Sequence, residues 1–187
     1  MNQFQAVTAY ELLEVPLTAR AAARASISKA ILFWGVTRIS LGWIFLWAFL
    51  DKTFGLGFPT EPAAAWLQGA SPTTPYLAFA SRGPFAAIFR KLAGSTVVEW
   101  LFMLGLLLIG VCLIVGIGVK IAGYSGAALM ALFYLSALWP RNNPFMNDFV
   151  IYIILLVAFA HNQAGHKIGL GRWWSRTRLV RACPVLE

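Results

Sequence analysis

The sequence predicts an all-α fold, a four-transmembrane-helix bundle with both termini cytoplasmic. Two observations predict it. Hydrophobic residues make up 59% of the 187 residues and charged residues only 12%, whereas a soluble domain has about 25% charged residues. The chain also holds four apolar segments of about the length that crosses a hydrocarbon core, which takes about 20 helical residues. A soluble chain this apolar could not cover its own core with polar side chains.

The four apolar segments are expected to be helices, because in lipid only a helix satisfies its own backbone hydrogen bonds within one segment. The fourth is the shortest, and its last third is the polar stretch His-Asn-Gln-Ala-Gly. The predicted layout is a cytoplasmic N-terminal arm at 1–29, a transmembrane domain at 30–168 with spans at about 30–50, 99–119, 121–139 and 148–166, and a basic cytoplasmic tail at 169–187. The first residues lack an apolar core followed by a cleavage site, so no signal peptide is predicted.

The distribution of lysine and arginine predicts the orientation. With four spans, both termini lie on one side, which holds nine basic residues against five on the other side. The more basic side is expected to be cytoplasmic. Nucleic-acid binding is not expected despite the net charge of +8, because the basic residues flank apolar runs instead of gathering on one soluble face. Tryptophans fall at both predicted interfaces, as is typical of membrane proteins: Trp43, Trp47, Trp100 and Trp139 outside, and Trp173 and Trp174 inside.

The connections differ greatly in length. The stretch "GVKIAG" predicts a tight turn between the second and third spans, whereas the outer loop at 51–98 is far longer than a connector needs. Within that loop, "SRGPFAAIFRKLAG" has apolar residues at i, i+3, i+4 and i+7, with Pro84 at the start and Gly94 at the end. This pattern predicts a short amphipathic helix on the outer membrane surface. The stretch "TEPAAAWLQG" indicates a second, shorter one.

Small residues indicate where helices pack closely. Gly123, Ala127 and Ala131 form a stripe on the third span, and Gly35 and Gly42 lie one heptad apart on the first. Small side chains let helix backbones approach each other in lipid. These residues are interpreted as structural.

Arg38 lies near the middle of the first span, where an arginine costs roughly 2.5–3.5 kcal/mol on insertion scales. One hypothesis is a polar cluster inside the bundle, in which Arg38 contacts His161 or Asn162, with Tyr124 and Ser125 nearby. The cluster could also hold a quinone. The alternative is that Arg38 extends to the inner headgroups.

A second polar group is expected at the outer end of the bundle. Lys52 follows Arg38 by 14 residues, so the two lie only about 40° apart around the helix. Asp51 points about 140° away and is interpreted as a boundary residue. The group at the outer end consists of Lys52, Glu99, Arg141, Asn143 and Asp148. These five residues could form an anion-binding or ion-pair cluster, or could be interfacial anchors and caps.

Few cofactors fit these residues. The two cysteines, Cys112 and Cys183, form no CxxC motif, and no metal site is predicted. His161 and His166 both lie on the fourth span, whereas haem b needs histidines on two facing helices. No covalent cofactor is therefore expected. A quinone remains possible, because it needs only an apolar slot, aromatic walls and one or two hydrogen-bonding groups.

Four stretches resemble the DoxX/DoxD family of small bacterial membrane proteins. They are "TRISLGWIFLWAFLDK", "GLLLIGVCLIVGIGVK", "NPFMNDFVIY" and "AGHKIGLGRWW", and the resemblance covers roughly residues 30–175. It implies a multi-pass protein of the bacterial inner (plasma) membrane. DoxD-like members form the membrane subunit of a thiosulfate:quinone oxidoreductase. The matching signature positions are Arg38, Gly42, Lys52, Asn143, Pro144 and Asp148, and Phe149 stands where relatives often have histidine.

The leading hypothesis is a DoxX-type, quinone-associated redox subunit, with the lipid bilayer and further proteins as partners. Lys52 and Arg141 could attract thiosulfate at the outer face, and Arg38 could orient a quinone carbonyl. The alternative is a non-catalytic accessory or assembly subunit of a larger respiratory or redox-stress membrane complex. A small transporter is less favoured, because no inverted repeat is visible.

Overall fold

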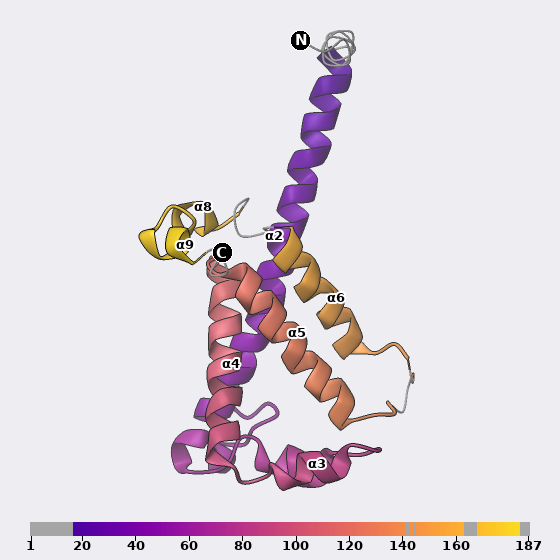
Figure 1. Ribbon diagram of the computed structural model, residues 1–187, viewed down its shortest axis with the longest axis vertical. Helices are drawn as coiled ribbons and strands as arrows, with labels where there is room; N and C mark the ends of the chain where they lie inside the picture. The colour runs from indigo at the N-terminus through magenta and orange to yellow at the C-terminus, as the bar shows by residue number, and fades with distance from the viewer. Residues whose placement is uncertain (1–16, 141–142, 144, 163–167, 184–187) are drawn as a thin grey trace. The chain divides into compact units, whose positions relative to one another are not determined.

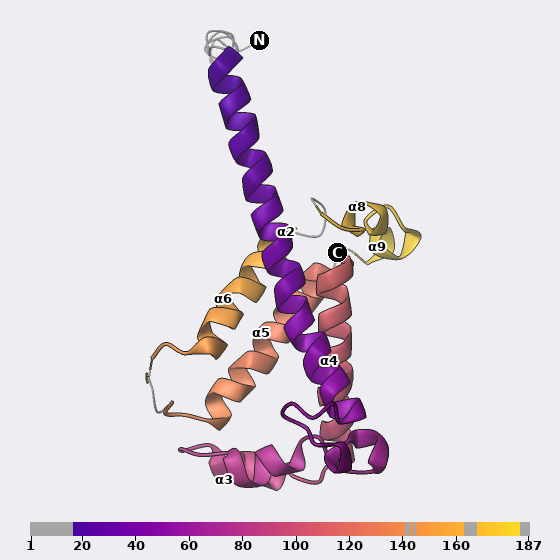
Figure 2. The ribbon, with the colours of Figure 1, turned by 180° about the vertical axis from the view of Figure 1, so that it is seen from behind.

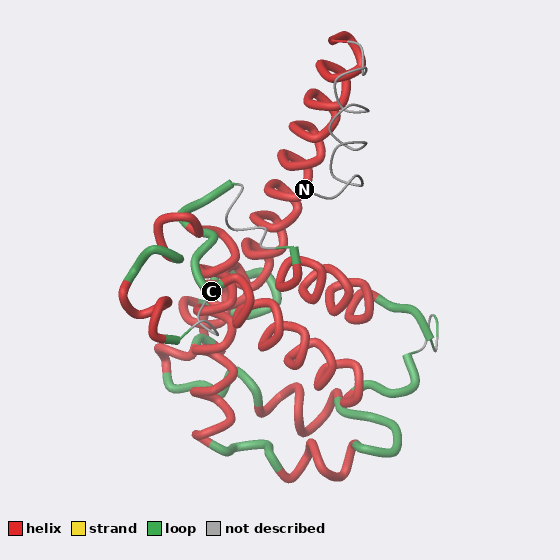
Figure 3. The backbone as a smooth tube through the Cα atoms, turned by 45° about the horizontal axis from the view of Figure 1, so that its top comes forward, coloured by secondary structure: helices red, strands yellow, loops and turns green. Residues whose placement is uncertain are grey.

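The computed structural model describes residues 17–140, 143, 145–162 and 168–183, and these are mostly helical with no β-strand among them (Figure 3). The all-α prediction is confirmed for this part of the chain. The chain forms two compact units, Met1–Trp34 and Gly35–Glu187. The α-helices are α2 (Leu17–Phe54), α3 (Ala86–Lys91), α4 (Thr96–Val115), α5 (Val119–Ser136), α6 (Asp148–His161), α8 (Gly171–Trp174) and α9 (Arg178–Ala182) (Figure 1).

Helix α2 begins well before the predicted first span. Its first turns carry the sequence LTARAAARASISKA, and alanine, leucine, arginine and lysine are strong helix formers. The helix ends where Gly55 takes a positive φ of 65° and its N–H donates to the Asp51 carbonyl at 2.8 Å. A left-handed glycine is the usual helix stop.

Three helical segments are long and apolar enough to cross a membrane: Ser26–Phe54, Thr96–Val115 and Val119–Ser136. They indicate a membrane protein whose apolar surface contacts lipid. Helix α6 has 14 residues, or about 21 Å at 1.5 Å per residue, which is less than a core of about 30 Å. The predicted fourth span extends over residues 163–167, outside the described part, and it stays a prediction.

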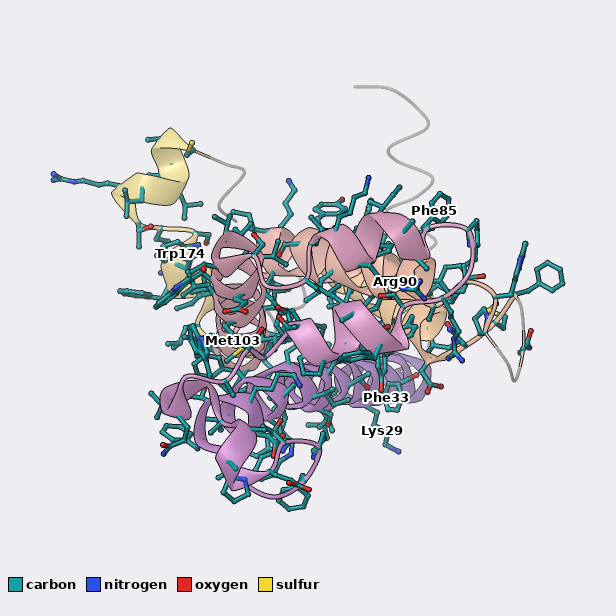
Figure 4. All side chains as sticks on the ribbon, turned by 90° about the horizontal axis from the view of Figure 1, so that it is seen from below. Lys29, Phe33, Phe85, Arg90, Met103 and Trp174 are labelled. Carbon is teal, nitrogen blue, oxygen red and sulfur yellow. The ribbon has the colours of Figure 1, made fainter. Side chains whose placement is uncertain are left out.

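Helices α2, α4, α5 and α6 contribute to one hydrophobic core. Helices α5 and α6 run side by side (Figures 1 and 2), and Met103 of α4 is fully buried (labelled in Figure 4). The core residues include Leu41, Phe45, Leu106, Ile109, Leu113, Val119, Ala122, Met130, Leu156 and Phe159. Many large apolar side chains on the same helices are exposed, as expected for surfaces that face lipid.

Glycines let the helix backbones approach each other within this core. A Cβ atom added to Gly42 would lie 3.0 Å from the Gly110 carbonyl oxygen, and one added to Gly123 would lie 2.6 Å from the Leu156 carbonyl oxygen. Gly123 and Ala127 of the predicted stripe are buried, and Ala131 is half-buried. The crossing of α2 over α4 pairs Gly42 with Gly110, whose role was not predicted.

The outer loop contains short helical segments. Helix α3 matches the predicted amphipathic helix, and "TEPAAAWLQG" forms two 3₁₀ turns, η1 (Pro62–Ala64) and η2 (Trp66–Gln68). A π-helical turn, η3 (Tyr76–Ala80), was not predicted. Its Tyr76 hydroxyl shares a hydrogen bond of 2.9 Å with Ser136 Oγ at the end of α5. The loop is thereby held against the helical core.

Candidate functional site

A half-open cavity of about 210 Å³ is lined by residues of the four core helices. Nearly all of its lining surface is carbon, and Lys52 is the only charged residue among those that line it. The lining residues are Ile44, Phe45, Ala48 and Lys52 of α2, Phe102 and Leu106 of α4, Met130 and Phe133 of α5, and Phe149 and Tyr152 of α6. The chemistry of the cavity is therefore that of an apolar slot with one cationic side chain.

Aromatic rings form one wall of the cavity. Phe133 and Phe149 stack with their centroids 5.7 Å apart and an interplanar angle of 14°, and Phe102 meets Phe133 edge-on at 6.0 Å. Tyr76 of the outer loop packs edge-on against Phe133 at 5.2 Å. Rings in these arrangements attract each other beyond their apolar burial. The wall is thus held in place from both the core and the loop.

Lys52 lies in the last turn of α2 and is half-buried. The prediction that it projects into the bundle agrees with its place in the cavity lining. Within the described part of the chain, its ammonium group has no hydrogen bond or ion pair, although the adjacent Asp51 attracts it electrostatically. The partners considered for it lie elsewhere, since Glu99 accepts a hydrogen bond from Ser71 Oγ and Asp148 is exposed. The predicted ion-pair cluster does not form among these residues.

Asp51 lies in the last turn of α2, where a boundary residue was predicted, but its side chain does not face the interface. Its side chain is only 1% exposed, and its Oδ1 accepts a hydrogen bond of 3.4 Å from the Phe58 backbone N–H. The outer loop folds back over the end of α2 and covers it. Asp51 therefore organises the start of the loop, which a helical-wheel argument on α2 alone could not show.

Arg38 is completely buried within the chain. Its guanidinium donates to the carbonyl of Leu113 and, at 2.5 Å, to that of Ile168. Leu113 lies in the last turn of α4, where the helix dipole favours a cation. The buried charge of Arg38 is thus matched by a helix end instead of a carboxylate. The Nε atom of Arg38 has no hydrogen-bond partner in the described part of the chain.

The predicted cluster of Arg38 with His161 or Asn162 is not formed. Both of the latter side chains are exposed, and His161 Nδ1 lies 3.0 Å from the Val157 carbonyl oxygen while its ring meets Tyr124 edge-on. The segment that begins at Ile168 lies at the end of α4, where the Leu170 N–H donates to the Val115 carbonyl at 3.0 Å. It presents the Ile168 carbonyl to Arg38, and this carbonyl and that of Leu113 in α4 take the place of the predicted side-chain partners.

The polar residues before α6 shape the backbone. Asn143 Oδ1 accepts hydrogen bonds from the N–H groups of Phe145 and Met146, at 3.0 and 3.1 Å. Asn147 caps α6 by accepting from the Val150 N–H at 3.2 Å. Asp148 lies in the first turn of α6, as predicted. These contacts fit the interpretation of the polar residues before α6 as turn and cap residues.

Several residues named from the sequence lie outside the described part: Arg141, Pro144 and His166.

The aromatic lining was not predicted as a site. The helices are apolar around most of their circumference, so their sequence pattern does not separate cavity-lining residues from lipid-facing ones.

No group of three His, Cys, Asp or Glu side chains that could hold a metal ion occurs among the described residues. The chain matches no protein-family model, no curated protein and no solved structure.

Proposed function

We propose that this chain is a DoxX-type protein of the bacterial plasma membrane, with four spans and cytoplasmic termini, that binds a quinone in the Lys52 cavity as a redox subunit. The observation that carries the proposal is the composition of the cavity. It combines aromatic walls, an apolar lining and one cationic group, which are the features required of a quinone site.

The volume of the cavity suits a quinone ring. A cavity of about 150 Å³ can hold benzene, so one of about 210 Å³ has room for a ring with small substituents. Phe133 and Phe149 offer faces and edges against which such a ring can pack. Lys52 can donate a charge-assisted hydrogen bond to one carbonyl oxygen of the ring.

When bound, a quinone would supply a two-electron acceptor. Lys52 would then hold one oxygen and favour negative charge on it, while the apolar lining would exclude water. The same lining disfavours thiosulfate inside the cavity, because an anion loses its hydration there without compensation. In the proposed activity, thiosulfate therefore binds at the outer face, where Arg141 was predicted to attract it, and Lys52 serves the quinone instead.

Binding is tested with decylubiquinone and the purified protein in nanodiscs, measured as a rise in the midpoint of thermal unfolding. A ligand that binds only the folded state stabilises it in proportion to the logarithm of its concentration. Lys52→Met keeps the apolar stem but removes the charge. A hydrogen bond to a charged group contributes about 1.5–3 kcal/mol, so the affinity should fall about ten- to hundredfold. The matched control is Lys91→Met, which removes an exposed lysine on α3.

No stabilisation by decylubiquinone, or equal stabilisation of the Lys52 and Lys91 variants, would contradict the proposed site. The catalytic part is tested separately, as thiosulfate-dependent reduction of decylubiquinone by the same preparation. Quinone binding without reduction, together with stable co-purifying membrane proteins, would favour the accessory-subunit alternative.

A further inference from the structure

The segment at 168–183 begins at one end of α4. The Leu170 N–H donates to the Val115 carbonyl at 3.0 Å, and Arg38 donates to the Ile168 carbonyl. Gly169 lies between these contacts with a φ of 129°, and a Cβ atom there would lie 2.7 Å from the Val115 carbonyl oxygen. Because α4 is long and apolar enough to cross a membrane, the segment starts where a span meets the membrane surface.

The segment is folded locally. It forms α8 and α9 (yellow in Figure 1, with Trp174 labelled in Figure 4). The Trp174 N–H donates to the Leu170 carbonyl at 2.9 Å, and the Thr177 N–H donates to the Trp174 carbonyl at 3.0 Å. Val180 is only 4% exposed. The arrangement of its outward side chains is therefore defined.

Those outward side chains are cationic and apolar. The segment contains no aspartate or glutamate, and its four arginines are all exposed. Trp173 is 62% exposed and Leu179 is 64% exposed. Lys120, at the start of α5 beside the end of α4, is exposed as well. The four arginines are Arg172, Arg176, Arg178 and Arg181.

We propose that the segment at 168–183 is a docking surface for the anionic headgroups of the lipid leaflet at which α4 ends. Arginine binds phosphate through paired, charge-assisted hydrogen bonds, and clustered basic residues beside a span attract anionic lipid. Tryptophan favours the level of the headgroups, where an apolar side chain such as Leu179 can enter the acyl boundary. A nucleic acid or an acidic protein would use the arginines, but it would not explain why the segment is fastened to the end of a span.

The test uses Cys183, which is exposed at the end of α9. The full chain, with Cys112→Ala to leave one thiol, is labelled with an environment-sensitive fluorophore and placed in nanodiscs. These contain phosphatidylcholine with or without phosphatidylglycerol and carry a lipid-borne quencher. We expect quenching and a blue shift only with phosphatidylglycerol, and reversal of both by high salt.

Substitutions separate the effect of the positive charge from that of the guanidinium group. Each single Arg→Gln change in the segment should weaken the association with phosphatidylglycerol about fivefold, and the fourfold Arg→Gln variant should lose it. The fourfold Arg→Lys variant should retain a response, and Arg82→Gln in the outer loop is the charge-matched control. Unchanged far-UV circular dichroism and thermal midpoint show that each variant is folded.

Three results would overturn the proposal. They are equal quenching without phosphatidylglycerol, full quenching in the folded fourfold Arg→Gln variant, and a fluorophore that responds to added RNA, acidic peptide or inorganic phosphate but not to the lipid.

Discussion

The crossing of α2 over α4 gives a sharp test of the structure through Gly110→Ala. A Cβ atom at Gly110 would lie 2.7 Å from the Leu46 backbone nitrogen and 3.0 Å from the Gly42 carbonyl oxygen. Both are backbone atoms, so a flexible side chain cannot move aside. Gly105 lies on the same helix, and a Cβ atom there would meet nothing within 4 Å. Gly105→Ala is therefore the matched control.

The magnitude follows from two opposing terms. Alanine in place of glycine in a helix interior stabilises by about 0.8–1.0 kcal/mol, and this gain applies to both variants. Overpacking a tight contact costs about 1–3 kcal/mol, and this cost applies only to Gly110→Ala. We expect Gly110→Ala to be less stable than Gly105→Ala by about 1–3 kcal/mol. For a chain of this size that difference corresponds to about 2–12 °C in Tm.

The assay is thermal unfolding in nanodiscs, followed by far-UV circular dichroism, with the parent chain and both variants in the same lipid. Gly105→Ala should unfold at or slightly above the midpoint of the parent, and Gly110→Ala clearly below the control. A Gly110→Ala midpoint equal to or above that of Gly105→Ala would show that the two backbones do not meet at Gly42 and Gly110, and would refute this helix crossing.

Three further substitutions test separate contacts. Arg38→Met leaves the buried Leu113 carbonyl and the half-buried Ile168 carbonyl without this donor, at about 1–3 kcal/mol for the buried group. Trypsin should then cut after Arg172 several-fold faster, and an unchanged rate would show that Arg38 does not fasten the segment. Asn147→Ala should cost about 0.5–2 kcal/mol through loss of the helix cap, measured as a lower Tm, whereas an unchanged Tm would contradict the cap. Tyr76→Phe keeps the ring but loses the hydrogen bond to Ser136. The free energy that protects the loop amides from hydrogen exchange should therefore fall by about 0.5–1.5 kcal/mol; equal exchange would show that the bond does not hold the loop.

Helix identity and the local stops were predictable because they depend on neighbouring residues. The runs that became α4 and α5 are apolar over nearly a membrane thickness, and their tight turn needs two left-handed glycines, Gly116 and Gly118. Helix α3 follows from its apolar spacing and its closing glycine. The early start of α2 was missed, because the charges near its N-terminus hid an alanine-rich helical stretch from a search for apolar spans.

The candidate site was predictable only in part. The period of one helix was enough to place Lys52 on the inner face. It could not identify Phe133 and Tyr152 as lining residues, because that depends on which faces of α5 and α6 turn toward α2. The same limit applies to Asp51, whose burial comes from a loop that folds back, and to Arg38, whose partners are carbonyls distant in the sequence.

The sequence by itself determined the chemical class of this protein. Apolar length, charge distribution and turn residues act locally or through composition, so they predict helices, surfaces that avoid water, and an arginine that needs partners. Only the tertiary structure decided which groups meet. A buried charge can be matched by any carbonyl or carboxylate within reach, and an apolar face can pack on another helix or on lipid. In this protein, packing assigned Arg38 to the end of α4 and Lys52 to an aromatic cavity.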